Sequence, residues 1–469
     1  MIMTIARKEF TEMFRDGRVR SGGLALLLLV GGSLLYGMRQ TQQLATERDT
    51  ARQLTRAHWV SQPAKNPHSA AHYGIYAFKP RATLATLDDG VDPYVGVTTW
   101  LEAHKQNEFQ FRPAQDATSA QRFGTLTAAT TLQLLVPLLI ILLGFAVFAG
   151  EREQGTLRQV LSLGVKPSVL GAGKALGVAG VLSLVLIPAA VLGVIAITGM
   201  PDGGSDLVRL GVMIVSYIAY FVAWLALTLA ISAFASTARV SLAASLGVWM
   251  LVCILAPRLM TDVVRSVHPT PSASAFAAAM KRDLDGGFDG HATGAQREKL
   301  FEEAVLKKYG VDSLSQLPVS FAGLSLHEGE RHGDEVFDKH YGALWTTFAE
   351  QERVRELAAV VSPVLAMRSL SMALAGTDVA QHLHFQNAAE QYRRSLMTAM
   401  NGEMTMKSKG QDFDYKADPS TWSNVAPFDY EAPSAAWVLQ RHTPAMLFLG
   451  VWAAGAVLLA GWSIGRMTP

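Results

Sequence analysis

Six long apolar stretches are separated by polar segments along the 469-residue chain. None of the six carries an ionisable residue near its middle, and they cover residues 22–38, 126–148, 170–198, 208–234, 240–260 and 443–463. A helix needs about 20 apolar residues to cross a bilayer, with a range of about 17–25, so each stretch is long enough to be a span. The pattern predicts an α-helical integral membrane protein with six transmembrane helices.

Two polar segments, residues 39–123 and 262–442, are large enough to form a domain outside the membrane. In the first, Asn-Pro, Lys-Pro, Asp-Gly and Asp-Pro pairs predict short strands or loops, which end in a helix near 117–125. The second segment is expected to be mostly helical, with helices at 272–284, 295–309, 334–358, 362–374 and 378–401. The remaining divisions are 1–38, 124–261 with a short helix at 150–165, and 443–469.

Residues 2–18 place apolar side chains on one helical face and charged side chains on the other. This arrangement predicts a helix that lies in the membrane interface ahead of the first span. A cleaved signal peptide is the competing interpretation, but no small-x-small site closes the apolar stretch convincingly. We therefore expect the first span to remain part of the protein.

Composition and charge support a membrane protein and indicate its orientation. Half of the residues are hydrophobic and only 17% are charged, against about a quarter in soluble domains. Basic residues precede the first span, follow the second and sixth, and lie between the fourth and fifth, whereas the link 199–206 has none. The positive-inside rule then puts both termini in the cytoplasm and the two large segments outside. All twelve histidines fall in those segments, and the net charge of +2 does not suggest nucleic-acid binding.

The sequence "EREQGTLRQV", residues 151–160, follows the second span directly. Gly155 interrupts it, and "TLRQVLSL" after the glycine can form a short amphipathic helix, whose apolar contacts are expected from Leu157, Val160, Leu161 and Leu163. The segment is either a solvated loop that obeys the positive-inside rule or a rigid surface for a cytoplasmic partner. The residues alone leave both interpretations open.

An internal energy source is not encoded in the chain. The string nearest to a P-loop, "GVKPSVLGAGKA", has Ser168 at the required first glycine and Ala175 at the hydroxyl position that binds magnesium. Ion-coupled transport needs ionisable residues within the spans, and the spans have none centrally. We therefore expect no cofactor bound by this chain and energy supplied by a partner.

Metal ligands are a weaker possibility in the outer segments. The string "HEGERH" is not a zinc-protease motif, because His327 and His332 are five residues apart, about 140° around a helix. A site for a metal such as copper could draw on two histidine pairs and a thioether cluster: His68, His72, His382, His384, Met397, Met400 and Met404. Methionines at this spacing are more often the apolar stripe of a helix, so packing is the favoured interpretation of that cluster.

The six spans, the N-terminal interfacial helix and "GEREQGTLRQVLSLGV" after the second span resemble the ABC-2 type permeases of ATP-binding-cassette transporters. The resemblance implies a coupling region that docks on a cytoplasmic ABC ATPase, formed here by Glu151, Glu153, Gly155, Thr156, Leu157 and Arg158. It also implies that ATP and Mg²⁺ bind to that ATPase and that a second permease, identical or homologous, completes the transporter.

Further stretches, including "NPHSAAHYGIYAFKP" and "SPVLAMRSLSMALAGTD", resemble a bacterial subfamily with large extracytoplasmic insertions after the first and fifth spans. The permease that assists maturation of nitrous oxide reductase is a more distant resemblance. These imply a multi-pass protein of the bacterial inner membrane, in contact with lipid, that drives export or moves its periplasmic domains against a periplasmic protein. The alternative is a metal-handling or mechanotransmission module without transmembrane flux.

Overall fold

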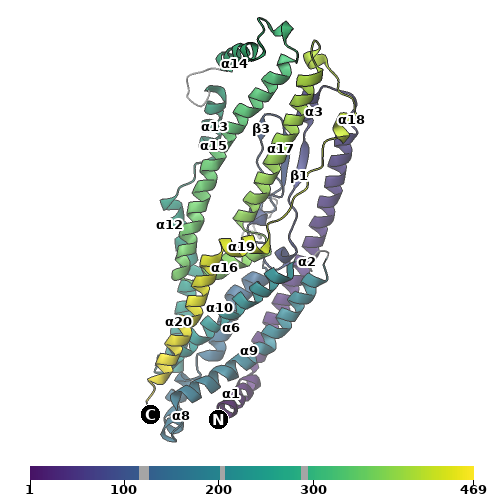
Figure 1. Ribbon diagram of the computed structural model, residues 1–469. Helices are drawn as coiled ribbons and strands as arrows, with labels where there is room; N and C mark the ends of the chain where they lie inside the picture. The colour runs from purple at the N-terminus through teal and green to yellow at the C-terminus, as the bar shows by residue number, and fades with distance from the viewer. Residues whose placement is uncertain (116–125, 201–205, 287–293, 469) are drawn as a thin grey trace.

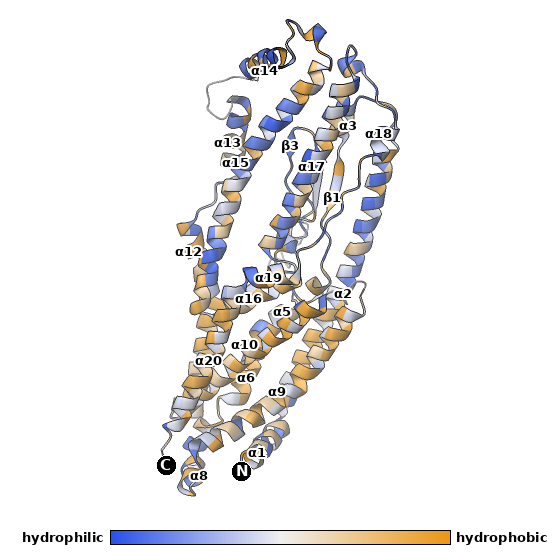
Figure 2. Cartoon of the chain, viewed as in Figure 1, coloured by the Kyte–Doolittle hydropathy of each residue, from blue (hydrophilic) through white to orange (hydrophobic). Residues whose placement is uncertain are grey.

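The structure, a computed structural model, describes residues 1–115, 126–200, 206–286 and 294–468. Its helices form an elongated molecule in which apolar residues gather in one half and polar residues in the other (Figures 1 and 2). Both ends of the chain lie at the tip of the apolar half, beside α1 (Ile2–Arg15) and α8 (Thr156–Ser162). We call this tip the terminal end and the polar half the outer domain.

Six helical stretches of the described residues are long and apolar enough to cross a membrane, which confirms the predicted number of spans. Three of them are single helices: α2 (Gly17–Val60), α9 (Pro167–Thr198) and α10 (Leu207–Phe234). The sixth is also unbroken and is α20 (Thr443–Gly465). The second span comprises α5 (Ala128–Thr130), η3 (Thr131–Leu135), α6 (Val136–Gly144) and α7 (Ala149–Glu153), and the fifth comprises α11 (Ala238–Trp249), η5 (Met250–Leu255) and α12 (Ala256–Val267).

The two composite spans each contain a π-helical turn just before a proline. The η3 turn precedes Pro137, and the η5 turn precedes Pro257. A proline removes one backbone donor, and its ring clashes with the carbonyl four residues earlier in a regular α-helix. A wider turn relieves that clash, so the helix passes the proline without ending.

The first span continues as one helix far beyond the predicted boundary at residue 38. Helix α2 ends at Val60, so the expectation of loops and strands immediately after the span is wrong. Residues 39–60 are rich in Gln, Arg and Ala, which are good helix formers, and the next proline comes only at position 63. The helix therefore has no local reason to stop at the end of the apolar stretch, and it runs into the outer domain (Figure 1).

After α2, the chain forms short elements in the outer domain, as predicted. They are α3 (Pro67–Tyr73), β1 (Ile75–Phe78), η1 (Thr83–Thr86), α4 (Asp92–Val95), β2 (Thr98–Glu102) and β3 (Lys105–Gln106). The strands form one antiparallel sheet in the order β1-β2-β3, with Ile75 opposite Leu101. The helix expected near 117–125 lies outside the described residues.

The second outer segment is mainly helical, as predicted. It contains α13 (Ala273–Gly286), α14 (Gly294–Tyr309), η6 (Leu314–Gln316), α15 (Phe321–Leu357), η7 (Ala358–Val360), α16 (Pro363–Ala375), α17 (Val379–Lys407), η8 (Asp412–Asp414), α18 (Ser420–Ser423) and α19 (Ala435–Arg441). The predicted start of the third helix at 334 is wrong, because α15 begins 13 residues earlier, after an N-cap at Ser320. Gly323 has no side chain, so α15 can lie directly against the backbone of Thr405. This packing outweighs the low helix propensity of the glycines in α15.

The largest hydrophobic core links the spans to the outer domain. Helix α10 contacts α6, α16 and α20, and α16 is buried along most of its length between the spans and the outer elements. Within the outer domain, α17 contacts α3, β2 and α15. Trp59 near the end of α2 is fully buried and donates a 2.9 Å hydrogen bond to the carbonyl of Trp422. The long helix α2 is thus packed at both of its ends.

Candidate coupling site

The segment 151–163 forms a sharp helical corner at the terminal end. Helix α7 ends at Glu153, and α8 begins at Thr156 after Gly155, which has a φ of 76°. The single short helix predicted at 150–165 is therefore wrong, because the left-handed Gly155 divides it and α8 ends at Ser162. A left-handed backbone favours glycine at this position, because other residues pay a steric penalty there. The Thr156 hydroxyl donates a 3.2 Å hydrogen bond back to the carbonyl of Glu151, so the corner is also held by a side chain.

Helix α8 buries one face and exposes the other. Leu157 and Leu161 are buried in the main hydrophobic core. The expected apolar contact of Leu163 is wrong, because α8 ends at Ser162 and Leu163 is 83% exposed. Exposed residues of the corner include Glu153, Gln154, Gly155, Arg158 and Gln159, and we call this set the coupling surface. It offers charges and hydrogen-bonding groups on a fixed scaffold, which suits binding of another protein.

Two charged side chains of α7 attach the corner to the link between the fourth and fifth spans. The Arg152 guanidinium donates to the carbonyls of Ala233 and Ala235 at 2.7 and 2.6 Å, at the C-terminal end of α10. A cation there satisfies carbonyls that have no partner within the helix. The Glu153 carboxylate accepts a 3.1 Å bond from the amide of Ala238, at the start of α11. The corner is therefore fixed to two further spans.

The N-terminal helix α1 packs closely against the start of α9. A Cβ atom added at Gly173 would lie 2.6 Å from the Cβ of Ile5, and one at Gly177 would lie 2.6 Å from the Cβ of Glu9. Glycines four residues apart let two helix backbones approach closely, as they do in membrane helix pairs. This contact fixes α1 along the first turns of the third span.

A buried ion pair network joins α1, α7 and α9. The Lys174 ammonium, 1% exposed, donates to Glu9 at 2.7 Å and to Glu151 at 2.8 Å. Both carboxylates form ion pairs with the same buried ammonium, so removal of the lysine would leave each of them without this partner. The coupling surface and the N-terminal helix are thus mechanically connected through Lys174.

Lys8 adds a second cation at the edge of this network. Its ammonium lies 3.3 Å from Glu151, 3.5 Å from Glu9 and 3.2 Å from Glu12. Partial burial lowers the pKa of Lys8, but attraction to Glu9, Glu151 and Glu12 outweighs it and raises the pKa to about 12. The lysine therefore stays charged at any physiological pH.

The predicted coupling residues have different positions in this site. Glu151 and Thr156 are partly buried, Leu157 belongs to the core, and Glu153, Gly155 and Arg158 are exposed. Lys174 and Glu9 did not emerge from the sequence as site residues. A signal was present, because Lys174 is a single cation beside Gly171, Gly173 and Gly177 in an otherwise apolar helix.

The predicted metal-ligating residues occupy three separate surroundings. Met397 and Met400 are buried in a hydrophobic cluster, and Met404 is also fully buried, which supports a packing role. His382 stacks edge-on against Phe109, and the His384 ring lies 3.0 Å from the hydroxyl of Tyr430. His68 and His72 lie together on α3, with their Nε2 atoms 3.1 Å apart.

A cavity of about 850 Å³ lies where the fifth span meets the outer domain. Its walls come from α12, α15, α16, α17 and the segment around α4. Apolar and aromatic side chains such as Met260, Tyr341 and Trp345 line it. The charged lining residues are four arginines and two glutamates, so the lining is net positive: Arg112, Arg265, Arg355, Arg368, Glu108 and Glu352. A mixed lining of this kind suits an amphipathic molecule with an anionic group.

The fold and this site together define a multi-pass helical membrane protein with a rigid helical corner at one end of its spans and a large domain at the other. Residues 3–273 match the family described as ABC-2 family transporter protein, so the chain belongs to that family and is a transporter permease. Residues 273–431 match a second family, described as a domain of unknown function, DUF3526. A comparison with curated proteins returned no match.

Proposed function

We propose that this permease couples ATP hydrolysis by a separate cytoplasmic ABC ATPase to export across the bacterial inner membrane. Membership of the ABC-2 family supports a partner ATPase, which would bind the ATP and Mg²⁺. The single observation that carries the proposal is the contact of Lys174 with both Glu9 and Glu151. It makes α1, α7 and α9 one unit that a docked ATPase can displace together.

Force applied to the coupling surface has a defined route into the spans. Arg152 and Glu153 connect it to α10 and α11, and Lys174 connects it to α1 and α9. Packed helices transmit displacement as nearly rigid bodies, because close-packed interiors have low compressibility. The unbroken α2 then extends the movement from the membrane to the buried Trp59 in the outer domain.

The charge at the terminal end supports a cytoplasmic location for both termini. Arg7, Lys8, Arg15 and Arg20 lie on or beside α1, close to the coupling surface, and basic residues favour the cytoplasmic side. The outer domain would then face the periplasm, where it is accessible to a periplasmic protein. Exposed apolar side chains on the spans, including Leu28, Ile195 and Val451, would contact lipid or a second permease subunit, identical or homologous.

The cavity beside α12 is the proposed site for the exported molecule. It lies at the outer end of the fifth span, and its lining holds four arginines and two glutamates next to aromatic side chains. An amphipathic substrate would place its apolar part against Trp345 and its anionic group near Arg368.

Photo-cross-linking in native membranes tests the docking. A photoreactive residue replaces Arg158 on the coupling surface or, as a control, the exposed Lys409, which follows the end of α17 in the outer domain. Mass spectrometry should identify an ABC ATPase linked at position 158 and not at position 409. Arg158→Glu should reduce the co-purified ATPase by about tenfold or more, whereas Lys409→Glu should not, because reversing a charge within an interface opposes association.

Failure to recover an ATPase at position 158, or equal recovery from wild type and Arg158→Glu, would refute docking at this surface. Reconstitution of the purified complex in proteoliposomes then tests export itself. Substrate-stimulated ATP hydrolysis with measurable flux supports export. Stimulation by a periplasmic protein without flux would replace export with mechanical work on that protein.

A further inference from the structure

We propose that His68, His72 and His104 form a binding site for a divalent transition-metal ion, Zn²⁺ being the best match, on the surface of the outer domain. Their ligand nitrogens all lie within 4.8 Å of one another. The site is independent of the coupling surface, and it adds His104, which is 32 residues from His72 in the sequence, to a pair on one helix.

Helix α3 presents the first two ligands on one face. His68 and His72 are four residues apart, so their side chains project from successive turns in nearly the same direction. The helix start is fixed by Asn66, whose side-chain oxygen accepts a 2.9 Å hydrogen bond from the His68 amide. Asn66 also donates to the backbone carbonyls of Phe413 and Tyr415 at 3.1 and 3.2 Å. The orientation of the pair is therefore anchored to the rest of the outer domain.

The third ligand comes from the turn that joins β2 to β3. His104 has a φ of 63°, a left-handed backbone that is uncommon for a residue other than glycine. The preceding amide, of Ala103, donates a 3.2 Å hydrogen bond to the carbonyl of Ala71, which ties this turn to α3. The His104 ring centroid lies 5.2 Å from the ring centroids of both His68 and His72. A strained residue held in such a position is consistent with a functional role.

The distances suit tetrahedral coordination. Ligand nitrogens about 2.0–2.1 Å from Zn²⁺ are about 3.3 Å apart in a tetrahedron. The Nε2 atoms of His68 and His72 are 3.1 Å apart, and the remaining separations of up to 4.8 Å close with a small movement of the His104 side chain, which is 40% exposed. Three histidines leave a fourth position for water or another ligand.

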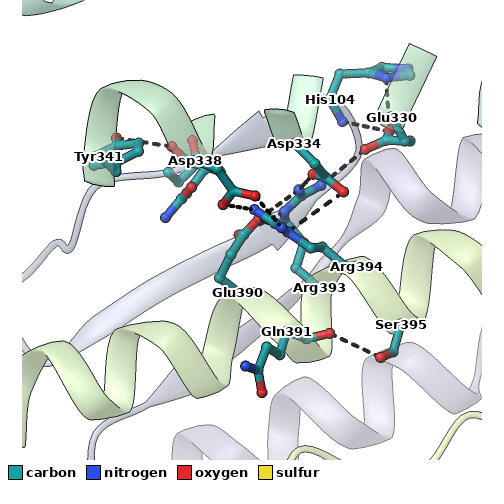
Figure 3. Close-up of polar contacts among 12 residues, drawn as sticks. His104, Glu330, Asp334, Asp338, Tyr341, Glu390, Gln391, Arg393, Arg394 and Ser395 are labelled. Atoms are coloured by element: carbon teal, nitrogen blue, oxygen red, sulfur yellow. Dashed lines mark hydrogen bonds and ion pairs between the residues drawn. The ribbon is translucent and has the colours of Figure 1, made fainter. Parts of the chain in front are cut away.

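Glu330 supplies the outer contact that metal-bound histidines commonly have. Its Oε1 lies 2.8 Å from the Nδ1 of His104 and also accepts a 2.8 Å bond from the backbone amide of His104. A donor bond from Nδ1 leaves the Nε2 lone pair of His104 free to face a metal. Figure 3 shows Glu330 between His104 and Arg393, whose fully buried guanidinium donates to the second carboxylate oxygen at 3.0 Å.

The wider network fixes Glu330 itself. Arg393 also contacts Asp334 and Glu390, so the carboxylate that orients His104 is part of a buried ionic cluster between α15 and α17 (Figure 3). Imidazole nitrogens suit Zn²⁺ and Cu²⁺ better than Mg²⁺ or Ca²⁺.

Metal titration of the full-length protein in detergent tests the site. The protein carries a non-histidine affinity tag, is stripped with a chelator, and is titrated with Zn²⁺ against a chromophoric chelator. We expect one high-affinity Zn²⁺ per chain, with affinity reduced by more than about 100-fold in His72→Ala and His104→Ala. Glu330→Gln should weaken binding by about 10–100-fold, the usual effect of removing a contact to a ligating histidine.

His58→Ala is the matched control, because His58 is an exposed histidine elsewhere in the outer domain, near the end of α2. Titration with Co²⁺ adds a second measurement, since coordination by the three histidines produces visible absorption that disappears in His72→Ala. His72 is exposed, so this variant should keep the wild-type melting temperature in the absence of metal. No stoichiometric binding in wild type, or equal binding in His72→Ala and His58→Ala, would overturn the proposal.

Discussion

Replacement of Lys174 by methionine tests whether the buried ion pair network fixes the N-terminal helix to the third span. The substitution keeps the length of the side chain and removes its charge. Lys174 is 1% exposed and Glu9 is 7% exposed at the side chain, so the change leaves Glu9 without its closest cation in a site that water hardly reaches. Lys8, which is half exposed, remains near both carboxylates and offsets part of the loss.

Removal of one partner of a buried ion pair costs about 3–5 kcal/mol. The remaining contacts of Lys8 and the partial exposure of Glu151 place this case at the lower end, about 3 kcal/mol. The cost falls on the docking of α1, because Glu9 is the residue of α1 that Lys174 binds. One pKa unit corresponds to 1.36 kcal/mol and a factor of ten, so the opening equilibrium of α1 should rise roughly 100-fold.

Amide hydrogen exchange followed by mass spectrometry measures that opening in detergent or nanodiscs. Peptides that cover residues 2–15 should exchange roughly 100-fold faster in Lys174→Met than in wild type. Lys166→Met is the control, because Lys166 is an exposed lysine shortly before Lys174. Combining Lys174→Met with Glu9→Leu should recover part of the protection, since no unpaired charge is then left on α1. Equal exchange in wild type and Lys174→Met would refute the account of α1 docking.

Two further predictions concern packing and pH. Gly177→Ala should weaken the docking of α1 by about 1–3 kcal/mol, because the new Cβ would lie 2.6 Å from the Cβ of Glu9. Faster amide exchange in residues 2–15 checks this prediction. Gly455→Ala is the control and should leave that exchange unchanged, since a Cβ there meets no described atom within 4 Å. Burial raises the pKa of the Asp88 carboxyl from 3.8 to about 6, although hydrogen bonds from Ser371 and Gly90 act in the opposite direction. The folded protein therefore favours the neutral carboxyl. The contribution of that neutral form to stability is complete below pH 4 and is lost as the pH rises through 6. The unfolding free energy of Asp88→Asn minus that of wild type should therefore increase by about 3 kcal/mol from pH 4 to pH 8, because only wild type must ionise the buried carboxyl. Denaturation in detergent measures both values, and a difference that does not change with pH would contradict this cause.

The spans could be predicted from the sequence because their signal is local. A stretch of about 20 apolar residues is stable only where water is excluded, and it satisfies its backbone groups within its own helix. The break at Gly155 could also be predicted, because this glycine directly precedes the amphipathic pattern of "TLRQVLSL". The resemblance of "GEREQGTLRQVLSLGV" to ABC-2 permeases pointed to the family that residues 3–273 match.

The length of the outer helices was less predictable. The apolar pattern of the first span ends near residue 38, whereas α2 continues to Val60 on helix-forming polar residues. The start of α15 was misplaced because glycines lower its local helix propensity, and close packing of Gly323 on Thr405 compensates only in the folded protein. Such compensation depends on a partner more than 80 residues away.

The sequence by itself determined the number of spans, the break at Gly155 after the second span and the polar character of the outer domain. Only the tertiary structure decided that Lys174 joins Glu9 to Glu151, and that His104 joins His68 and His72. Periodicity reports which face of one helix is apolar, but it carries no information about which polar side chains from distant segments meet. That information comes from close packing, which sets the distance between helices to within an ångström and so decides which charges and ligands lie within bonding reach.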